Sequence, residues 1–209
     1  RLIPRFYEPT AGRVLIDDQD IAQVSISSLR QAIGGVQQDP FLFTAAVDHN
    51  VAYADPSAGM DQIVQASTDA QIHSFIEELP KNYQTLVGED GVSLSGGQKQ
   101  RISIARGTLT DAPILIFDDA TAAIDAGTEQ YIRRALHERA GAHTTIIISH
   151  RLVSMMHADE ILFLEEGRIV ERGTHKQLLA LRERYFALHS LQLRDENQLA
   201  PLNEQIEPA

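Results

Sequence analysis

The sequence predicts an α/β fold whose core is a mostly parallel β-sheet. Two almost wholly apolar runs, residues 113–117 and 144–149, have the length of strands that are covered on both faces. Between them, residues 128–140 are long enough for one crossover helix, which completes a β-α-β unit. The chain has 209 residues, 43% of them hydrophobic, so it can bury a proper core.

Four shorter elements precede this unit and are delimited by turn residues. In chain order they are a helix end at 1–7, a strand at 14–17, a helical turn at 25–30 and a short apolar run at 33–36. Residues 45–81 then show helical spacing of apolar side chains, broken at Pro56 and Pro80. We interpret this stretch as a helical insert.

The C-terminal part of the chain predicts a hairpin, a helix and a tail. Residues 161–171 turn at Glu166 and Gly167, and residues 176–191 have the length of a last helix. Residues 194–209 combine acids with Gln, Asn and Pro and offer little to bury. We expect this end to be a mobile acidic tail.

Composition excludes several classes of protein. Lys and Arg total 18 against 29 acidic residues, a net charge of -11, which argues against a binder of nucleic acid backbones. No cysteine is present, so disulfides and thiolate metal sites are excluded. The sequence holds no run of 18 apolar residues, and any membrane role is expected to depend on a partner.

Polar side chains follow three of the predicted strands. They are Asp118 and Asp119 after 113–117, His150 after 144–149, and Gln38 after 33–36. Because the carboxyl ends of parallel strands line the ligand crevice, we expect these side chains to converge on one edge. An acid in this place can hold Mg²⁺, since a hard cation prefers carboxylate oxygen. Taken alone, an acid pair can also cap the following turn, and a lone histidine is more often structural.

The strongest local signal is the octet at residues 94–101, Leu-Ser-Gly-Gly-Gln-Lys-Gln-Arg. Gly96 and Gly97 allow the backbone to come close to an anion. A helix beginning at about Gln98 directs its unpaired N–H groups to the same place, and the Ser95 hydroxyl adds a donor. A bare Ser-Gly-Gly is also an ordinary helix-entry turn, but the whole octet resembles the signature motif of ABC-type ATPases.

The resemblance extends over nearly the whole chain and assigns roles to single residues. Gln38 is similar to the Q-loop glutamine, Asp118 to the Walker B aspartate, Asp125 to the D-loop aspartate and His150 to the switch histidine. The family implies ATP and Mg²⁺ as ligands, with the metal held by Asp118 and Gln38. It implies catalytic roles for Asp119, His150 and Gln38, and nucleotide contacts by Ser95, Gly96, Gly97, Gln98 and Asp125.

The same resemblance implies the architecture of the domain. We expect a P-loop NTPase-type (RecA-like) sheet with an ABC helical subdomain inserted at about 40–108, together forming an ATPase domain over 1–193. Residues 79–91 are similar to the stretch that precedes the signature in ABC exporters, where Glu89 lies in the X-loop. This implies contacts of the Gln38 and Glu89 regions with an exporter's transmembrane domain, at the cytoplasmic face of the plasma (inner) membrane.

Two features depart from the family pattern. The P-loop pattern G-x-x-x-x-G-K-[ST] is absent, because none of Lys81, Lys99 and Lys176 follows a glycine. We therefore expect that the first strand and the P-loop are missing and that the chain alone is inactive. The family's catalytic base is a Glu after the Walker B aspartate, and the shorter Asp119 stands there, which predicts a slow site.

ABC ATPase domains pair head to tail, so the resemblance implies a second such domain as partner. An intact signature motif together with an altered catalytic base favours one half of a heterodimer. The alternative is a homodimer in which an aspartate is tolerated at the position of the base. Two other functions compete with an exporter ATPase. One is a soluble ABC protein acting on nucleic acid or ribosomes, which the net charge disfavours. The other is a non-enzymatic fragment.

Overall fold

The computed structural model describes residues 1–88, 91–121, 123–138 and 143–203. These form two compact units, Arg1–Ile148 and Ser149–Ala209, each of which is described by itself below. The boundary divides the predicted 1–193 domain after its last parallel strand. Among the helices of the described part, none combines the length and the apolar character that a membrane span needs.

The N-terminal segment is a series of turns and not the predicted helix end. Pro4 lacks an N–H group and Arg5 has a positive φ of 53°, so a helix cannot continue through this pair. The strand predicted at 14–17 is present as β1 (Leu15–Ile16), which pairs antiparallel with β2 (Gln19–Asp20). A 3₁₀ turn at Ile21–Gln23 leads on from this hairpin.

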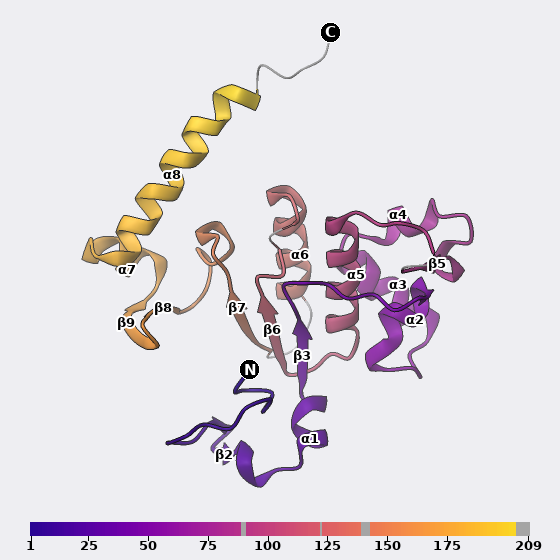
Figure 1. Cartoon of the computed structure of the whole chain (residues 1–209), viewed down its shortest axis with the longest axis horizontal. Coiled ribbons are helices and arrows are strands. Elements are labelled where there is room, and N and C mark those ends of the chain that lie inside the picture. The colour runs from indigo at the N-terminus through magenta and orange to yellow at the C-terminus, as the bar shows by residue number, and fades with distance from the viewer. Residues whose placement is uncertain (89–90, 122, 139–142, 204–209) are drawn as a thin grey trace. The chain divides into compact units, whose positions relative to one another are not determined.

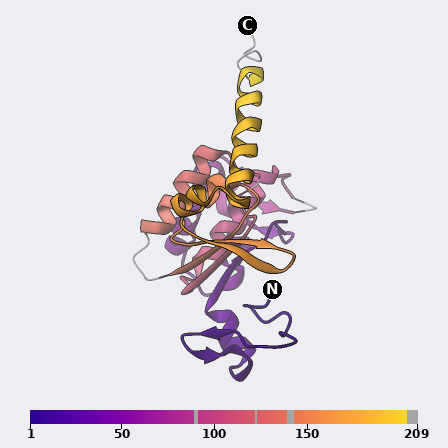
Figure 2. The ribbon, with the colours of Figure 1, turned by 90° about the vertical axis from the view of Figure 1, so that its left-hand side faces the viewer.

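A three-stranded parallel sheet forms the centre of the first unit, as predicted (Figures 1 and 2). Helix α1 (Ile26–Gln31), capped by the Ser25 hydroxyl, leads into β3 (Ile33–Val36). Strand β6 (Ile114–Asp118) lies between β3 and β7 (Thr144–Ile148). Helix α6 (Ala126–Glu138) is the predicted crossover between β6 and β7, begun two residues earlier.

The helical insert is confirmed as three helices, which Figure 1 shows clustered beside α5 (Gly96–Leu109). They are α2 (Val47–Val51), α3 (Met60–Asp69) and α4 (His73–Glu77), with 3₁₀ turns at Ala52–Ala54 and Asn82–Gln84. The antiparallel strands β4 (Ala45–Ala46) and β5 (Leu86–Val87) pair the beginning of the insert with its end. One buried apolar cluster joins the insert to the sheet, so the two fold as one core.

Helix α5 connects the insert to the parallel sheet through a very close approach. A Cβ atom built on Gly34 of β3 would lie 2.4 Å from the carbonyl oxygen of Gly107 in α5. A Cβ on Gly107 would lie 2.7 Å from the Val36 side chain. Only glycine fits at both positions, so the helix and the strand pack backbone against backbone.

The second unit is built from the predicted hairpin and two helices in place of one. Strands β8 (Ile161–Glu165) and β9 (Arg168–Gly173) turn at Glu166 and Gly167. A 3₁₀ turn at Leu152–Ser154 precedes them, and α7 (His175–Leu181) and α8 (Arg184–Asn203) follow. Arg182 in the left-handed conformation ends α7.

Helix α8 extends into the segment that was expected to be a tail. Its first two N–H groups, at Arg184 and Tyr185, donate to the buried carboxylate of Glu171 at 2.6 and 3.2 Å. A carboxylate at a helix N-terminus is favourable, and it fixes the start of α8 against β9. The helix then continues to Asn203, so residues 194–203 are helical, and the mobility of residues 194–209 stays a prediction.

Candidate functional site

The carboxyl ends of the parallel strands form the first part of the site. Strand register places Val36 beside Phe117, and Asp118 beside Ile148, so all three strands end at one edge. The Gln38 Nε2 group lies 3.5 Å from Asp119 Oδ2, although the two residues are 81 positions apart. We call Gln38, Asp118 and Asp119 the strand edge. The structure thus brings the Gln38 and Asp119 side chains together, with Asp118 adjacent in the chain at the end of β6.

Asp119 is held in an unusual backbone conformation. Its φ is 46°, and its N–H donates to the Ile148 carbonyl oxygen at 2.7 Å, at the end of β7. Left-handed conformations are adopted most readily by Asn and Asp among residues with a side chain. The turn after β6 therefore suits an aspartate better than a glutamate, which gives a local reason for the residue present.

The donor set at the strand edge fits a magnesium ion. Asp118 is exposed at the end of β6 and offers carboxylate oxygens, and Gln38 offers an amide oxygen. Among the described residues no group of three or more His, Cys, Asp or Glu side chains could hold a metal by itself. Mg²⁺ is usually bound by one or two protein carboxylates, with phosphate and water supplying the rest, so two oxygen donors are sufficient.

The signature residues form a capped helix start, which we call the signature turn (Ser95–Gln98). The Ser95 hydroxyl accepts from the Gln98 N–H at 3.3 Å, and the Gln98 side chain accepts from the Ser95 N–H at 2.8 Å. The helix begins at Gly96, two residues before the predicted start. Because the Ser95 oxygen only accepts the bond from the Gln98 N–H, its own O–H remains able to donate. Ser95 and Gly96 are both exposed. The turn can therefore present donors to an anion.

The two glycines of the signature turn are not equivalent. A Cβ on Gly97 would lie 2.9 Å from the backbone oxygen of Ala123, whereas a Cβ on Gly96 would meet no atom closer than 3.8 Å. Gly97 is therefore required for packing inside this chain, against the loop after β6. Only Gly96 is next to free space, into which a ligand from outside the chain could approach.

Asp125 caps the N-terminus of α6 in the first unit. Its Oδ1 accepts from the Thr128 N–H at 2.9 Å, which caps the start of α6. Hydrogen bonds from the Thr128 backbone and side chain lower the pKa of this exposed carboxyl below its ordinary value. The capping bond fixes the loop that also contacts Gly97, so the expected nucleotide contact by Asp125 remains a prediction.

His150 lies directly after β7 and belongs to the second unit. It is exposed, and its carbonyl oxygen accepts from Gln192 Nε2 of α8 at 2.7 Å, while Gln192 Oε1 accepts from the Leu152 N–H at 3.0 Å. Gln192 therefore fixes the backbone after the strand. The position of His150 relative to Gln38 and the two aspartates stays a prediction, and Glu89 lies outside the described residues.

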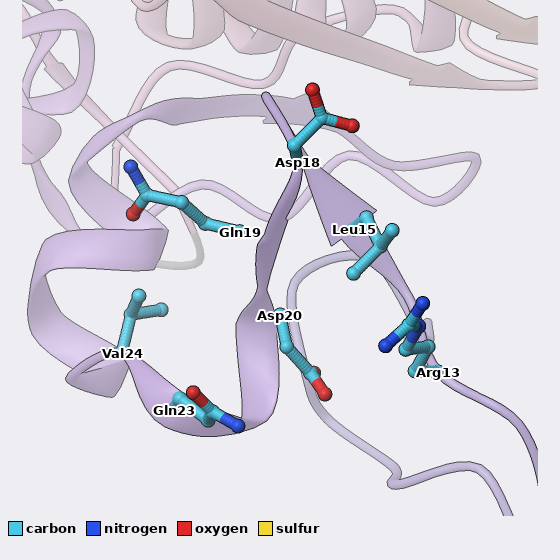
Figure 3. A pocket seen from close by; sticks show the side chains of 7 residues that line it. All are labelled: Arg13, Leu15, Asp18, Gln19, Asp20, Gln23 and Val24. Carbon is cyan, nitrogen blue, oxygen red and sulfur yellow. The ribbon is translucent and has the colours of Figure 1, made fainter.

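A hollow of about 650 Å³ lies elsewhere, beside the β1–β2 hairpin (Figure 3). It is lined by Arg13, Leu15, Asp18, Gln19, Asp20, Gln23 and Val24. Figure 3 shows the Asp18 and Asp20 side chains pointing in different directions, away from each other. Two carboxylates and one guanidinium without convergence do not suit a phosphate, so this hollow is not part of the site.

Sequence reasoning missed the polar groups that connect the signature helix to the strand edge. Gln100 of α5 is buried, and its Nε2 donates to the Gln37 carbonyl oxygen at 3.2 Å. Arg106, further along α5, donates to backbone and side-chain oxygens around Asn50 and Phe41. The available signal was Arg106, the one charged residue between Ile102 and Leu109 of α5.

The parallel sheet, with polar residues at its carboxyl edge and the inserted helices beside it, defines an α/β domain of the P-loop NTPase type. The family model described as "ABC transporter" matches residues 1–122, and the chain belongs to this family. A solved structure of a bacterial Atm1-family ABC exporter with ATP bound superposes with a TM-score of 0.88 at 45% identity, covering 92% of this chain and 34% of that one. This match confirms the predicted P-loop NTPase-type fold of an ABC exporter ATPase domain.

Curated relatives carry names of the same kind. The chain is 48% identical over 194 residues to the ATP-dependent lipid A-core flippase of Chromohalobacter salexigens, covering 93% of this chain and 34% of that protein. It is 47% identical over 191 residues to a putative multidrug export ATP-binding/permease protein of Bacillus subtilis, covering 91% of this chain and 33% of that protein. The chain thus spans about a third of the length of these relatives.

Proposed function

We propose that this chain is part of the ATP-binding and ATP-hydrolysing domain that powers export by an ABC transporter, and that the chain is inactive alone because its sequence contains no P-loop pattern. The observation that carries the proposal is the signature turn, whose capped helix start exposes Ser95 and Gly96 to an approaching phosphate. The similarity to ATP-dependent flippase and multidrug export proteins over more than nine-tenths of the chain supports the same function.

The residues of the chain divide between two nucleotide sites. Ser95, Gly96 and Gln98, with Asp125, are the proposed contacts to ATP that a second ABC ATPase domain holds. Gln38 and Asp118 would supply oxygens for Mg²⁺ at the chain's own strand edge, and the metal would neutralise charge on the phosphates. His150 is the proposed hydrogen-bond donor to the γ-phosphate or to the attacking water.

Asp119 takes the place of the general base at the strand edge. Its carboxylate is one methylene shorter than that of a glutamate, which leaves it about 1 Å further from the attacking water. A base at this distance accepts the proton poorly, so the site that this chain carries is slow. We infer a heterodimer in which the partner domain supplies the competent base and this chain supplies the signature turn.

The other partner is a transmembrane domain, contacted through the Gln38 and Glu89 regions. Phe41, three residues after Gln38, has 65% of its surface exposed, and Tyr53 of the insert has 58% exposed. Exposed aromatic rings of this size are typical of surfaces that bind another protein segment. Such a contact places the domain at the cytoplasmic face of the plasma (inner) membrane.

The test is ATP hydrolysis by the full-length protein reconstituted in lipid vesicles. Hydrolysis is expected to require Mg²⁺. Because the slow site contributes little turnover, Asp118→Asn is expected to weaken Mg²⁺-dependent labelling of this chain by a photoreactive ATP analogue while changing hydrolysis little. Asp61→Asn, which changes an exposed aspartate in the first turn of α3, is the matched control and is expected to leave both unchanged. Hydrolysis that is independent of Mg²⁺, or Mg²⁺-dependent labelling that Asp118→Asn does not weaken, would contradict the proposal.

A further inference from the structure

Three histidines of the second unit lie close together where α7 and α8 pack against each other (Figure 1). The His175 ring, at the first position of α7, has its centroid 5.4 Å from that of His189 on α8. His157, in the turn before β8, is near enough to repel a positive charge on His175. We call His157, His175 and His189 the histidine cluster. A proton taken up by His175 therefore faces two rings that can carry the same charge.

His175 also bonds to the buried hydroxyl of Tyr185. Its Nδ1 lies 2.7 Å from the Tyr185 oxygen, and the Tyr185 side chain is fully buried at the start of α8. Burial raises the pKa of Tyr185, so the phenol keeps its hydrogen and needs an acceptor for it. The Nδ1 atom of a neutral ring supplies this acceptor, and we therefore assign the ring hydrogen to Nε2. Protonation of His175 places a hydrogen on Nδ1 and removes the acceptor.

The charged groups on the neighbouring elements face other partners. Glu171 of β9 is buried and accepts from the first N–H groups of α8 at 2.6 and 3.2 Å. Arg184 pairs with Glu165 at 2.7 Å, and Lys176, next to His175 in the chain, is exposed. A protonated His175 would therefore have the other two histidines of the cluster as its charged neighbours.

These surroundings oppose protonation of His175. Burial lowers its pKa, and the nearby His189 and His157 lower it further. The pKa of His175 is thus lower in the folded chain than in the unfolded chain, where histidine titrates at about pH 6.5. As the pH falls below that value, the unfolded chain takes up more protons than the folded one, so the second unit loses stability in acid.

A second His–Tyr pair, in the first unit, provides a contrast. His73 stands at the first position of α4, and its Nδ1 lies 2.8 Å from the hydroxyl of the buried Tyr83, again ten residues later in the chain. Its Nε2 lies 3.5 Å from Glu77 Oε2, so a positive charge on this ring would face a carboxylate. The two pairs share their hydrogen bond and their place in a helix, but differ in the charge of their neighbours. Acid is therefore expected to weaken only the pair of His175.

Helix α8 connects the histidine cluster to the backbone at His150. Gln192 follows His189 by three residues, so the two side chains are neighbours on the helix surface. Gln192 Nε2 donates to the His150 carbonyl oxygen at 2.7 Å, and Gln192 Oε1 accepts from the Leu152 N–H at 3.0 Å. The position of α8 therefore fixes the backbone of residues 150–152.

We propose that the histidine cluster makes the second unit sensitive to protons, because uptake of a proton by His175 loosens the start of α8 and releases the backbone at His150. His175 is thus a positioning residue, which acts on His150 through Gln192. The loosening of α8 and of residues 150–152 is independent of nucleotide. Its consequence, weaker binding of ATP by this chain in acid, rests on the function proposed above.

The first measurement is hydrogen exchange of the full-length transporter at about pH 7.5 and about pH 5.5, with each rate divided by that of an unstructured peptide at the same pH. The corrected rates at the His189 and Leu152 N–H groups are expected to be about threefold or more faster at the lower pH. His175→Asn keeps an acceptor for Tyr185 but takes up no proton, so it is expected to remove most of this difference. His73→Asn is the matched control and is expected to leave the difference unchanged. A merely structural role of His175 would change exchange equally at both pH values.

The second measurement is Mg²⁺-dependent labelling of this chain by a photoreactive ATP analogue in the full-length transporter. Labelling of the unmodified protein is expected to fall about threefold or more between the two pH values, and to fall less in His175→Asn. Both proteins meet the same change in the protonation of the nucleotide, so the difference between them reports on His175.

Each outcome supports or overturns one part of the proposal. Exchange at His189 that is equal at the two pH values, or that rises as much in His175→Asn, would overturn the proton sensitivity. Faster exchange at His189 with unchanged exchange at Leu152 would overturn the link to His150, and equal labelling of both proteins in acid would overturn the consequence for ATP.

A second variant covers the case in which His175→Asn does not fold. His189→Gln removes a neighbouring charge and is expected to reduce the same pH dependence of exchange, and an undiminished dependence would overturn the proposal. Absence of Mg²⁺-dependent labelling of the unmodified protein at about pH 7.5 would reject the proposed function and leave the exchange measurement to test the histidine cluster alone.

Discussion

The signature turn and the strand edge, the two sites proposed to act on ATP, differ in how far apart in the sequence their residues lie. In the signature turn, the two capping bonds join Ser95 and Gln98, three residues apart. At the strand edge, the Gln38 and Asp119 side chains meet across 81 positions, and only the parallel pairing of β3 with β6 brings them together.

Because of this difference, the two sites depend on different parts of the fold. The hydrogen bonds of the signature turn need only residues at the start of α5, because a capping box satisfies the first helix N–H groups locally. Gly97 adds a long-range packing contact with the loop after β6. The strand edge needs the complete sheet, so any change that disturbs the packing of β3 on α5 disturbs it as well.

The largest effect is expected from a bulky side chain at Gly96 of the signature turn. Gly96→Val would fill the free space next to this residue and is expected to lower ATP hydrolysis of the assembled transporter about a hundredfold or more. Gly59→Val is the matched control, since a Cβ on Gly59 at the N-cap of α3 also meets its nearest atom at 3.8 Å. Equal activities of the two variants in a steady-state assay would show that nothing approaches Gly96. Gly97 is unsuitable for this test because of its contact with Ala123.

An intermediate effect is expected from removing the Ser95 cap, and a matched variant separates lost folding stability from lost ATP hydrolysis. Ser95→Ala and Thr174→Ala remove the same kind of cap, because Thr174 and Gln177 form a capping box at α7. Each is expected to cost about 1 kcal/mol of folding stability, measured by urea unfolding. Only Ser95→Ala is expected to reduce ATP hydrolysis, by about tenfold. A similar loss of activity in both variants would mean that stability alone accounts for it.

The smallest effect is expected at the strand edge itself. Asp119→Asn keeps a residue that tolerates the left-handed conformation, so the fold should be unaffected. If this chain carries the slow site of a heterodimer, turnover of the assembled transporter should stay within about twofold of normal. In a homodimer the change would remove the only base and lower turnover by about 10²- to 10⁴-fold. A fall of that size in steady-state turnover would reject the heterodimer.

The contrast between local and long-range contacts also explains how far the sequence could predict the molecule. The parallel strands and the hairpin follow from runs and turns of a few residues, and the signature turn follows from its own octet. The hydrogen bonds of Arg106 could not be predicted, because Asn50 and Phe41 meet Arg106 only after the insert has packed on α5. The extension of α8 beyond residue 191 could not be predicted, because composition does not reveal the buried Glu171 carboxylate that caps the start of α8 from thirteen residues away.

A single thiol can show whether the signature turn completes an ATP site held by a partner domain. The chain has no cysteine, so Ser95→Cys introduces one thiol into it, at a helix N-terminus where thiolate formation is favoured. The measurement is the rate at which N-ethylmaleimide alkylates this thiol, with and without ATP and Mg²⁺, followed by mass spectrometry. We expect ATP to protect the thiol in the assembled transporter and to have no effect in the 209-residue chain alone. Equal protection in both, or protection in neither, would show that the signature turn does not act on a partner's nucleotide.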